Sequence, residues 1–198
     1  MVLGEARITD EGLADLRSRL GRLYNITPNL EVVSRDAIRH FADGIGDRNP
    51  LWTDPTYASR TRFKVNLAPP AFLFAVFLCS GQAVGGLPGV HGFFGGAEWE
   101  WRRRIYRGDQ ITVTFRPADV VEKESTFAQR TVIVYGEAHY LTLRGELIGR
   151  ARGWTVRAER RAARERGKYA EIRKATYTPE QLAAIYDAQR QEQRQGAV

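Results

Sequence analysis

The chain has 198 residues, of which 43% are hydrophobic and 27% charged, enough for one domain with a buried core and short appendages. Its longest apolar run, Pro69–Cys79, is too short for a membrane span of about 20 residues, and no apolar signal segment follows the N-terminus. Cys79 is the single cysteine, which excludes an internal disulfide, so we expect a cytoplasmic protein with no membrane partner.

The net charge of +7 is concentrated in Arg102–Arg104 and in Arg157–Lys174. Such basic runs can bind nucleic acid, can bind the phosphates of coenzyme A or of a carrier's phosphopantetheine arm, or can simply be solvated. The sequence has no zinc-ligand spacing, phosphate-binding glycine loop or RNA-binding signature. We therefore expect no nucleic-acid partner, no metal ion and no cofactor.

The first third of the chain is predicted to contain two helices separated by a strand. Leucines at helical spacing predict a short amphipathic helix over roughly residues 10–24. A brief apolar strand is expected at Leu30–Val33. Ser34 is a favourable N-cap for a helix over Arg35–Gly44. The Asn-Pro and Asp-Pro pairs make Gly46–Pro55 a loop.

The rest of the chain is typical of one apolar helix followed by a sheet. Two prolines open a helix over Pro69–Cys79 that is apolar on all sides. Gly81–Gly96 is expected to be a glycine-rich loop, and a capping box at Thr178 predicts a C-terminal helix. Alternating or β-branched residues between turn signals predict four long antiparallel strands: Glu98–Tyr106, Gln110–Val121, Phe127–Thr142 and Glu146–Arg157.

An apolar helix followed by antiparallel strands predicts an α+β fold of the hot-dog type, in which a curled antiparallel sheet wraps around one central apolar helix. We expect the hot-dog domain over residues 30–157. An N-terminal helical extension over 1–29 and a basic C-terminal helical extension over 158–198 flank it. Edge strands of such sheets usually pair with another subunit, so an oligomer is expected.

Phe41–Pro55, which reads FADGIGDRNPLWTDP, resembles the hydratase signature of the MaoC family, in its N-terminal-dehydratase branch. Trp101–Asp109 resembles that family's strand and turn, with Arg104 where proline is usual. The resemblance covers roughly residues 30–157. It implies a hydro-lyase subunit of lipid metabolism, of the enoyl-CoA hydratase or 3-hydroxyacyl-thioester dehydratase type, whose substrate is an acyl-CoA or acyl-carrier thioester.

In that family an aspartate and a histidine five residues later share the attacking water, and amides at the start of the central helix polarise the thioester carbonyl. The resemblance carries the aspartate's catalytic role to Asp47. It carries the asparagine's role, which is to fix the loop, to Asn49. The polarising helix end corresponds to the amides after Pro70, near Ala71 and Phe72.

The histidine position is occupied by Trp52, whose indole donates one hydrogen bond and cannot transfer a proton at neutral pH. Three interpretations remain open. In the first, this chain shapes the acyl pocket and a second hot-dog subunit supplies an intact Asp/His pair. In the second, His91, expected in a loop beside Gly92, replaces the missing histidine as a catalytic residue. In the third, Asp47 only caps a turn, and the chain binds or scaffolds thioesters without catalysis.

Trp99 and Trp101 are two residues apart and share one face of their predicted strand, where they line either a pocket or an interface. A hot-dog thioesterase is less favoured, because Pro69–Ser80 offers no carboxylate to activate water. A homodimer is the alternative to a hetero-oligomer. The predicted substrate-binding residues are the following: Asn49, Trp52, Pro70, Ala71, Gly92 and Trp99.

Overall fold

The computed structural model describes residues 6–80, 87–125, 129–159 and 176–195. The chain divides into two compact units, residues 1–163 and 164–198. All five strands belong to the first unit. Among the described residues, no helix has the length and apolar character needed to cross a membrane.

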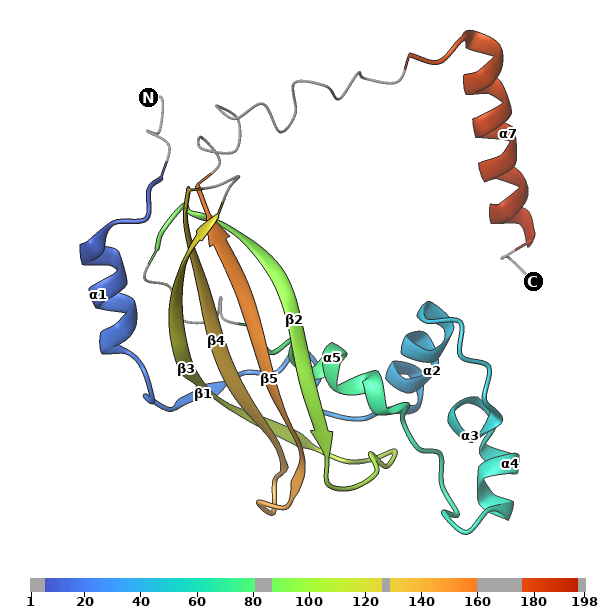
Figure 1. The fold of residues 1–198 in the computed structure, drawn as a ribbon. Helices are drawn as coiled ribbons and strands as arrows, with labels where there is room; N and C mark the ends of the chain where they lie inside the picture. Colours follow the sequence, from blue (N-terminus) through green and yellow to red (C-terminus); the bar gives the residue numbers. More distant parts are fainter. Residues whose placement is uncertain (1–5, 81–86, 126–128, 160–175, 196–198) are drawn as a thin grey trace. The chain divides into compact units, whose positions relative to one another are not determined.

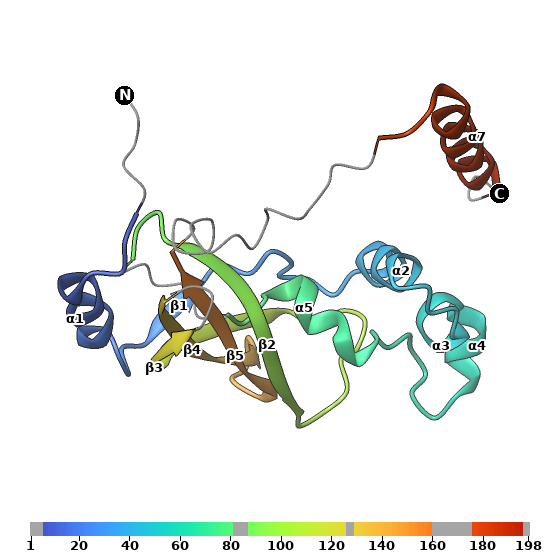
Figure 2. The same ribbon diagram turned by 45° about the horizontal axis from the view of Figure 1, so that its top comes forward.

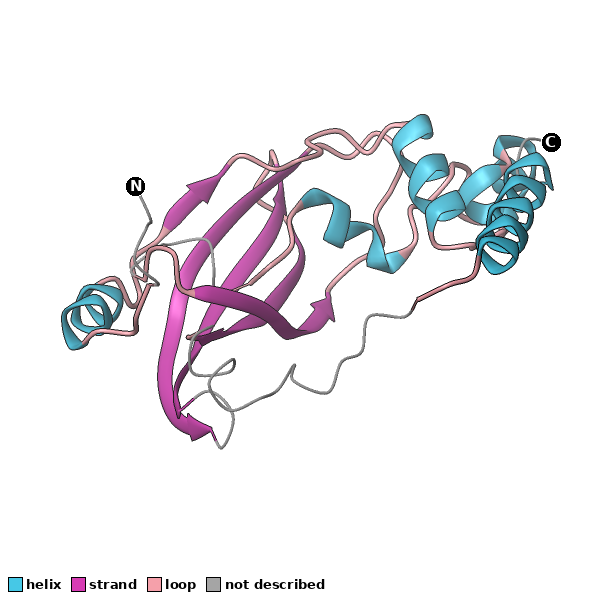
Figure 3. Ribbon diagram, turned by 90° about the horizontal axis from the view of Figure 1, so that it is seen from above, coloured by secondary structure: helices cyan, strands magenta, loops and turns pink. Residues whose placement is uncertain are grey.

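One antiparallel sheet dominates the first unit, with the strand order β1-β3-β4-β5-β2 (Figure 1). β3 pairs with β4 and β4 with β5, whereas β2 pairs with β5 alone among the described strands and forms an edge. The sheet curls, and the short helix α5 lies on its concave side (Figure 3), so the predicted curled sheet around one helix is confirmed. The strands are β1 (Tyr24–Ile26), β2 (His91–Trp101), β3 (Ile111–Ser125), β4 (Gln129–Thr142) and β5 (Leu147–Ala158).

Helices lie at both ends of this sheet, with α1 at one end and α2 to α4 at the other (Figures 1 and 2). Thr9, Ser34, Asn49 and Asp54 each accept a hydrogen bond from an amide of the helix that follows, which explains where these helices begin. The helical elements of this unit are α1 (Asp10–Ser18), α2 (Arg35–Gly44), α3 (Pro50–Thr53), α4 (Pro55–Arg60), the 3-10 turn η1 (Pro70–Phe72) and α5 (Leu73–Val76).

The second unit contains α7 (Pro179–Gln195). The predicted capping box is confirmed, because the Gln181 amide donates to the Thr178 hydroxyl (3.3 Å) and the Thr178 amide donates to the Gln181 side chain (2.9 Å). Residues 160–175, which carry most of the lysines and arginines of the predicted basic extension, lie outside the described residues.

The core has two clusters on the concave side of the sheet. The larger one packs α2 and α5 against β3, β4 and β5, and Phe72, Phe115 and Tyr140 are its largest fully buried side chains. The smaller one packs Leu13 and Leu16 of α1 against Val120 of β3 and against Val132 and Val134 of β4. The predicted N-terminal helix therefore docks on the sheet, although it ends at Ser18 rather than near residue 24.

Two strand predictions are displaced. The first strand is Tyr24–Ile26, which pairs with β3, whereas the predicted strand at Leu30–Val33 makes only an isolated bridge from Val32. β2 starts at His91 and ends at Trp101. The last part of the predicted glycine-rich loop is therefore strand, whereas the last five residues of the predicted strand Glu98–Tyr106 lie outside β2. A bulge after Phe94 allows this, because it turns the strand over the Trp154 ring.

The central helix is shorter than the predicted Pro69–Cys79. Its helical turns end at Val76, and Phe77 is already extended (φ −159°). The Tyr140 hydroxyl donates to the Phe77 carbonyl (2.6 Å) and holds the chain in this new direction. Beyond Phe77 the chain therefore crosses the concave face as an extended segment rather than as a helix.

A pair of glycines on neighbouring strands makes room for this extended segment. Gly136 of β4 and Gly153 of β5 lie directly opposite each other. A Cβ atom on Gly153 would lie 1.9 Å from the Cys79 carbonyl oxygen, and one on Gly136 would lie 3.1 Å from the Ser80 carbonyl oxygen. The two glycines thus bring the backbone of residues 79 and 80 against the sheet.

Cys79 belongs to this segment and is fully buried, and burial raises the pKa of its thiol to about 12. Because the thiolate is the reactive form, we expect the native chain to resist alkylation by iodoacetamide at pH 8. The urea-unfolded chain should take up one label in the same time, as measured by intact mass. Rapid labelling of the native chain would contradict the buried position.

Candidate active site

The loop between α2 and α4 fixes both carboxylate oxygens of Asp47. The Asn49 backbone N–H donates to Oδ1 (3.0 Å), and the Trp52 indole Nε1–H donates to Oδ2 (2.8 Å). The Asn49 side chain accepts the Leu51 amide (3.0 Å), so it fixes the loop as predicted. Asp47, Asn49 and Trp52 are therefore brought together, with an indole N–H where a proton-transferring base would be needed.

Asn66 anchors this loop to the rest of the unit. Its side chain, 2% exposed, donates to the Leu51 carbonyl (3.1 Å), and the Leu67 amide donates to the same oxygen (3.3 Å). The backbone carbonyl of Asn66 accepts a hydrogen bond from the Arg107 amide (2.9 Å). Asn66 was not among the predicted site residues, because a single asparagine in a polar stretch carries no periodic signal.

A cleft of about 380 Å³ opens between this loop and the start of η1. The Trp101 indole N–H donates to the Pro70 carbonyl (2.9 Å) and fixes the end of β2 against the start of the helix. The tryptophan of the carboxylate loop and the start of the buried helix therefore share one cleft. Its lining residues are Leu51, Trp52, Phe63, Leu67, Ala68, Pro70, Trp101, Arg102, Arg103, Arg104 and Ile105.

The amides predicted to polarise a carbonyl lie beside this cleft. Pro70 lines it, and the half-buried Ala71 follows. The Phe72 amide already donates to the Pro69 carbonyl (2.9 Å) within the turn. Of the two amides expected to act on a thioester, the Phe72 N–H is thus already used within the turn.

His91 and Gly92 lie at the opposite end of β2 from the cleft. Trp101, the last residue of this strand, contacts Pro70, and ten residue steps of extended chain span roughly 33 Å. Within one chain, His91 and Gly92 are therefore not brought together with Asp47. The predicted loop position of His91 is also wrong, because His91 is the first residue of the strand.

Trp99 lies beside the cleft rather than in its lining. Its ring stacks on Trp101 with centroids 6.1 Å apart and contacts Phe74 (4.6 Å) and Tyr140 (5.3 Å). It therefore forms part of the aromatic packing between α5 and β2, which supports the wall that Trp101 presents to the cleft.

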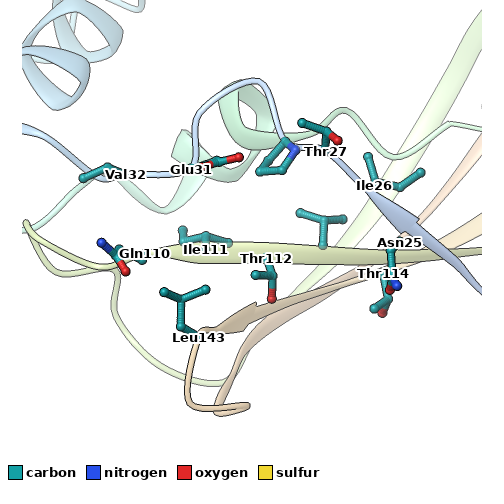
Figure 4. A pocket seen from close by; sticks show the side chains of 12 residues that line it. Asn25, Ile26, Thr27, Glu31, Val32, Gln110, Ile111, Thr112, Thr114 and Leu143 are labelled. Atoms are coloured by element: carbon teal, nitrogen blue, oxygen red, sulfur yellow. The ribbon is translucent and has the colours of Figure 1, made fainter.

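A second hollow of about 550 Å³ lies between the end of β1 and β3 (Figure 4). Glu31 is the one ionisable side chain among the residues that line it, and none of the predicted site residues is there. In the described part of the chain, no group of three or more His, Cys, Asp or Glu side chains is arranged to hold a metal ion. The cleft beside Trp52 is therefore the candidate active site.

Comparisons with known proteins show the family of the chain. The family model described as FAS1-like, dehydratase domain region, matches residues 21–150. A UPF0336 protein of Streptomyces avermitilis is 36% identical over 129 residues, which cover 62% of this chain and 83% of the relative.

Two solved structures share the fold. A MaoC-like dehydratase from Rhodospirillum rubrum is similar with a TM-score of 0.53 and 23% identity, over 71% of this chain and 93% of that chain. The C-terminally truncated HadBC (3R-hydroxyacyl-ACP dehydratase) complex from Mycobacterium tuberculosis is similar with a TM-score of 0.57 and 17% identity, over 70% and 96%. These likenesses confirm the predicted hot-dog fold.

Proposed function

The chain belongs to the FAS1-like dehydratase-region family and has the hot-dog fold of MaoC-like dehydratases, and on this premise we propose that it is a subunit of an acyl-thioester hydro-lyase. The reaction is the reversible addition of water to a 2-enoyl-CoA or enoyl-carrier thioester. The observation that carries the proposal is the hydrogen bond from Trp52 to Asp47 at the edge of a cleft that also reaches Pro70.

Hydration needs a base that takes a proton from water, a donor that protonates the α-carbon, and a group that stabilises the enolate oxygen. This chain offers the cleft and, next to Pro70, the Ala71 amide for the carbonyl. It does not offer a base beside Asp47, because the indole of Trp52 can only donate. We therefore assign acyl binding to this chain and assign the Asp/His pair to a second hot-dog subunit.

The edge strand β2 is the surface that such a partner would cover. Within the described ranges it pairs on one side only, and it carries large exposed apolar side chains: Phe93 (48% exposed), Phe94 (47%) and Trp101 (43%). A long edge with open backbone groups and apolar side chains favours pairing with another strand. The HadBC structure, which shares the fold, is itself a complex.

A homodimer that completes its own site is the second candidate, and the position of His91 favours it. If two copies pair antiparallel through β2, the ends of the two strands exchange places. The second copy's His91 then approaches the first copy's Trp101, and hence the cleft. In this arrangement each site uses Asp47 from one copy and His91 from the other.

The experiment compares the lone chain with the chain co-expressed with a hot-dog protein that copurifies from the native cell. Loss of enoyl absorbance measures hydration of crotonyl-CoA and of a longer 2-enoyl-CoA. We expect the lone chain to reach about 1% or less of the rate of the complex, because a positioned acid–base pair contributes about 100-fold or more.

Variants separate the candidates. If the lone chain is active and His91→Ala abolishes the rate, the homodimer is correct and the partner model is wrong. If the lone chain is fully active and neither Asp47→Asn nor His91→Ala changes the rate, both assignments fail. A complex that binds substrate but never hydrates it leaves the non-catalytic binding subunit as the answer.

A further inference from the structure

The three consecutive arginines that directly follow β2 differ in whether a carboxylate pairs with their charge. Arg102 pairs with Glu100 (2.5 Å), and the mostly buried Arg103 pairs with Asp109 (2.8 Å). Arg104 is exposed and makes no ion pair with any residue of the described segments. Its guanidinium carbon instead lies 5.0 Å from the centroid of the Phe63 ring. The charge of Arg104 is therefore the one that protein carboxylates leave uncompensated.

Arg62 places a second uncompensated charge on the same ring. Its guanidinium carbon lies 4.9 Å from the Phe63 centroid, and within the described ranges it too has no ion pair. Two groups so close to one centroid are at most about 10 Å apart, which is no more than the screening length at 0.1 M salt. The two cations therefore repel each other, and an anion bound close to both would relieve that repulsion.

The turn that presents Phe63 is held in an unfavourable backbone conformation. Lys64 has φ 62°, the one positive φ of a non-glycine residue among those that the structure describes. Its amide donates to the Thr61 carbonyl (3.2 Å), and the Phe63 amide donates to the Thr61 hydroxyl (3.2 Å). Such outliers concentrate at ligand sites, and this one directly follows Arg62 and Phe63 in the chain.

Phe63 and Arg104 both line the candidate cleft, together with Trp52 and Pro70. Arg104 thus lies at the same cleft as the proposed thioester position, and Arg62 is held there only through its contact with the Phe63 ring. A thioester of pantetheine has its sulfur at one end of an extended arm and a phosphate at the other. One cleft with apolar walls and a cationic rim matches both ends of such a molecule.

We propose that Arg62 and Arg104, held on the ring of Phe63, form a subsite for the phosphate of the pantetheine arm that carries the acyl group. This inference rests on the proposed function, because it takes the acyl thioester as the occupant of the cleft. The planar guanidinium group matches phosphate oxygens in a two-pronged geometry, and stacking on the ring restricts the side chains before the ligand arrives. The role belongs to this chain's own sequence, since Arg104 stands where the MaoC signature has proline.

The test measures binding of four ligands to the full chain by calorimetry: pantetheine, 4′-phosphopantetheine, dephospho-CoA and CoA. We expect phosphopantetheine to bind at least about tenfold more tightly than pantetheine, the effect of one or more charge-assisted hydrogen bonds. Arg62→Gln and Arg104→Gln should each bring the ratio of phosphopantetheine to pantetheine affinity down toward one. Arg116→Gln is the matched control, because it removes an exposed arginine that pairs with Glu137 away from the cleft.

The outcomes distinguish this subsite from the proposed function. If pantetheine binds and added phosphates give no advantage, or if the two variants behave like Arg116→Gln, the subsite is wrong while the acyl cleft stands. If phosphopantetheine binds and pantetheine does not, the subsite stands without the acyl cleft. Equal affinity for phosphopantetheine and CoA assigns the site to the arm's own phosphate, whereas a gain seen only with CoA assigns it to the coenzyme's other phosphates.

Discussion

A Gly153→Val variant should lose most of its folding free energy. A Cβ atom at this position would lie 1.9 Å from the Cys79 carbonyl oxygen and 2.6 Å from the carbonyl carbon, so backbone must move on one side of the contact. Overpacking by a single group commonly costs 1–3 kcal/mol, and displacement of backbone raises this to about 4 kcal/mol or more. Folded domains of this size have about 5–15 kcal/mol in total. Urea unfolding followed by circular dichroism measures the loss.

Gly44→Ala supplies the matched control. Gly44 is the last residue of α2, and a Cβ atom there would have no neighbour within 4 Å. Alanine is the better helix former, so this variant should unfold at the same urea concentration as the parent or a higher one. If Gly153→Val were as stable as Gly44→Ala, the segment after Phe77 would not lie across β5.

The central segment shows where sequence patterns stop being informative. Pro69–Cys79 is apolar throughout, and an unbroken apolar run looks the same whether it is a buried helix or a buried extended chain. What decides between them is the glycine pair on β4 and β5. That pair becomes visible only after the register places Gly136 opposite Gly153. The sheet itself was predictable, because alternation and turn signals are local.

The predicted start of β2 was wrong for a related reason. Gly92, Gly95 and Gly96 suggested a loop by composition, yet they belong to the strand. A Cβ atom on Gly95 or Gly96 would lie 2.4–2.5 Å from the Trp154 side chain, so these two residues are glycine to fit a ring on the neighbouring strand. Because the strand begins earlier than predicted, His91 is its first residue and lies at the end of β2 that is away from the cleft.

The candidate site was predictable where its residues are close in sequence. Asp47, Asn49 and Trp52 lie within six residues, and Asn49 accepts the loop-fixing hydrogen bond that was expected of it. The bond from the Trp52 indole to Asp47 was not expected, and the roles of these residues in binding or catalysis stay predictions. Asn66 and the stacking of Arg104 on Phe63 were not predictable. Both depend on the connection after β2 lying beside the loop of residues 61–67, which is a tertiary arrangement.

A Trp52→His variant should give the lone chain a hydration activity that the parent lacks. The indole N–H already donates to Asp47 Oδ2 at 2.8 Å, so one imidazole nitrogen has a partner waiting. Because Trp52 also lines the cleft, the other nitrogen would be available to a water molecule beside the substrate. A positioned general base contributes about 100-fold to 10,000-fold, so the gain should be visible in a stopped enoyl-CoA assay.

Two companion variants make this result specific. Trp52→Phe removes the donor to Asp47 without adding a base, so it should cost about 1–2 kcal/mol of stability and gain no activity. The double variant Trp52→His with Asp47→Asn should lose whatever the histidine gained, because the carboxylate no longer orients the ring. The gained rate should also fall below about pH 6.5, where an ordinary imidazole takes up a proton and stops acting as a base. If Trp52→His folds, binds pantetheine and still leaves the enoyl absorbance unchanged, the cleft does not hold a thioester in a reactive position, and the likeness of its loop to a hydratase site is structural only.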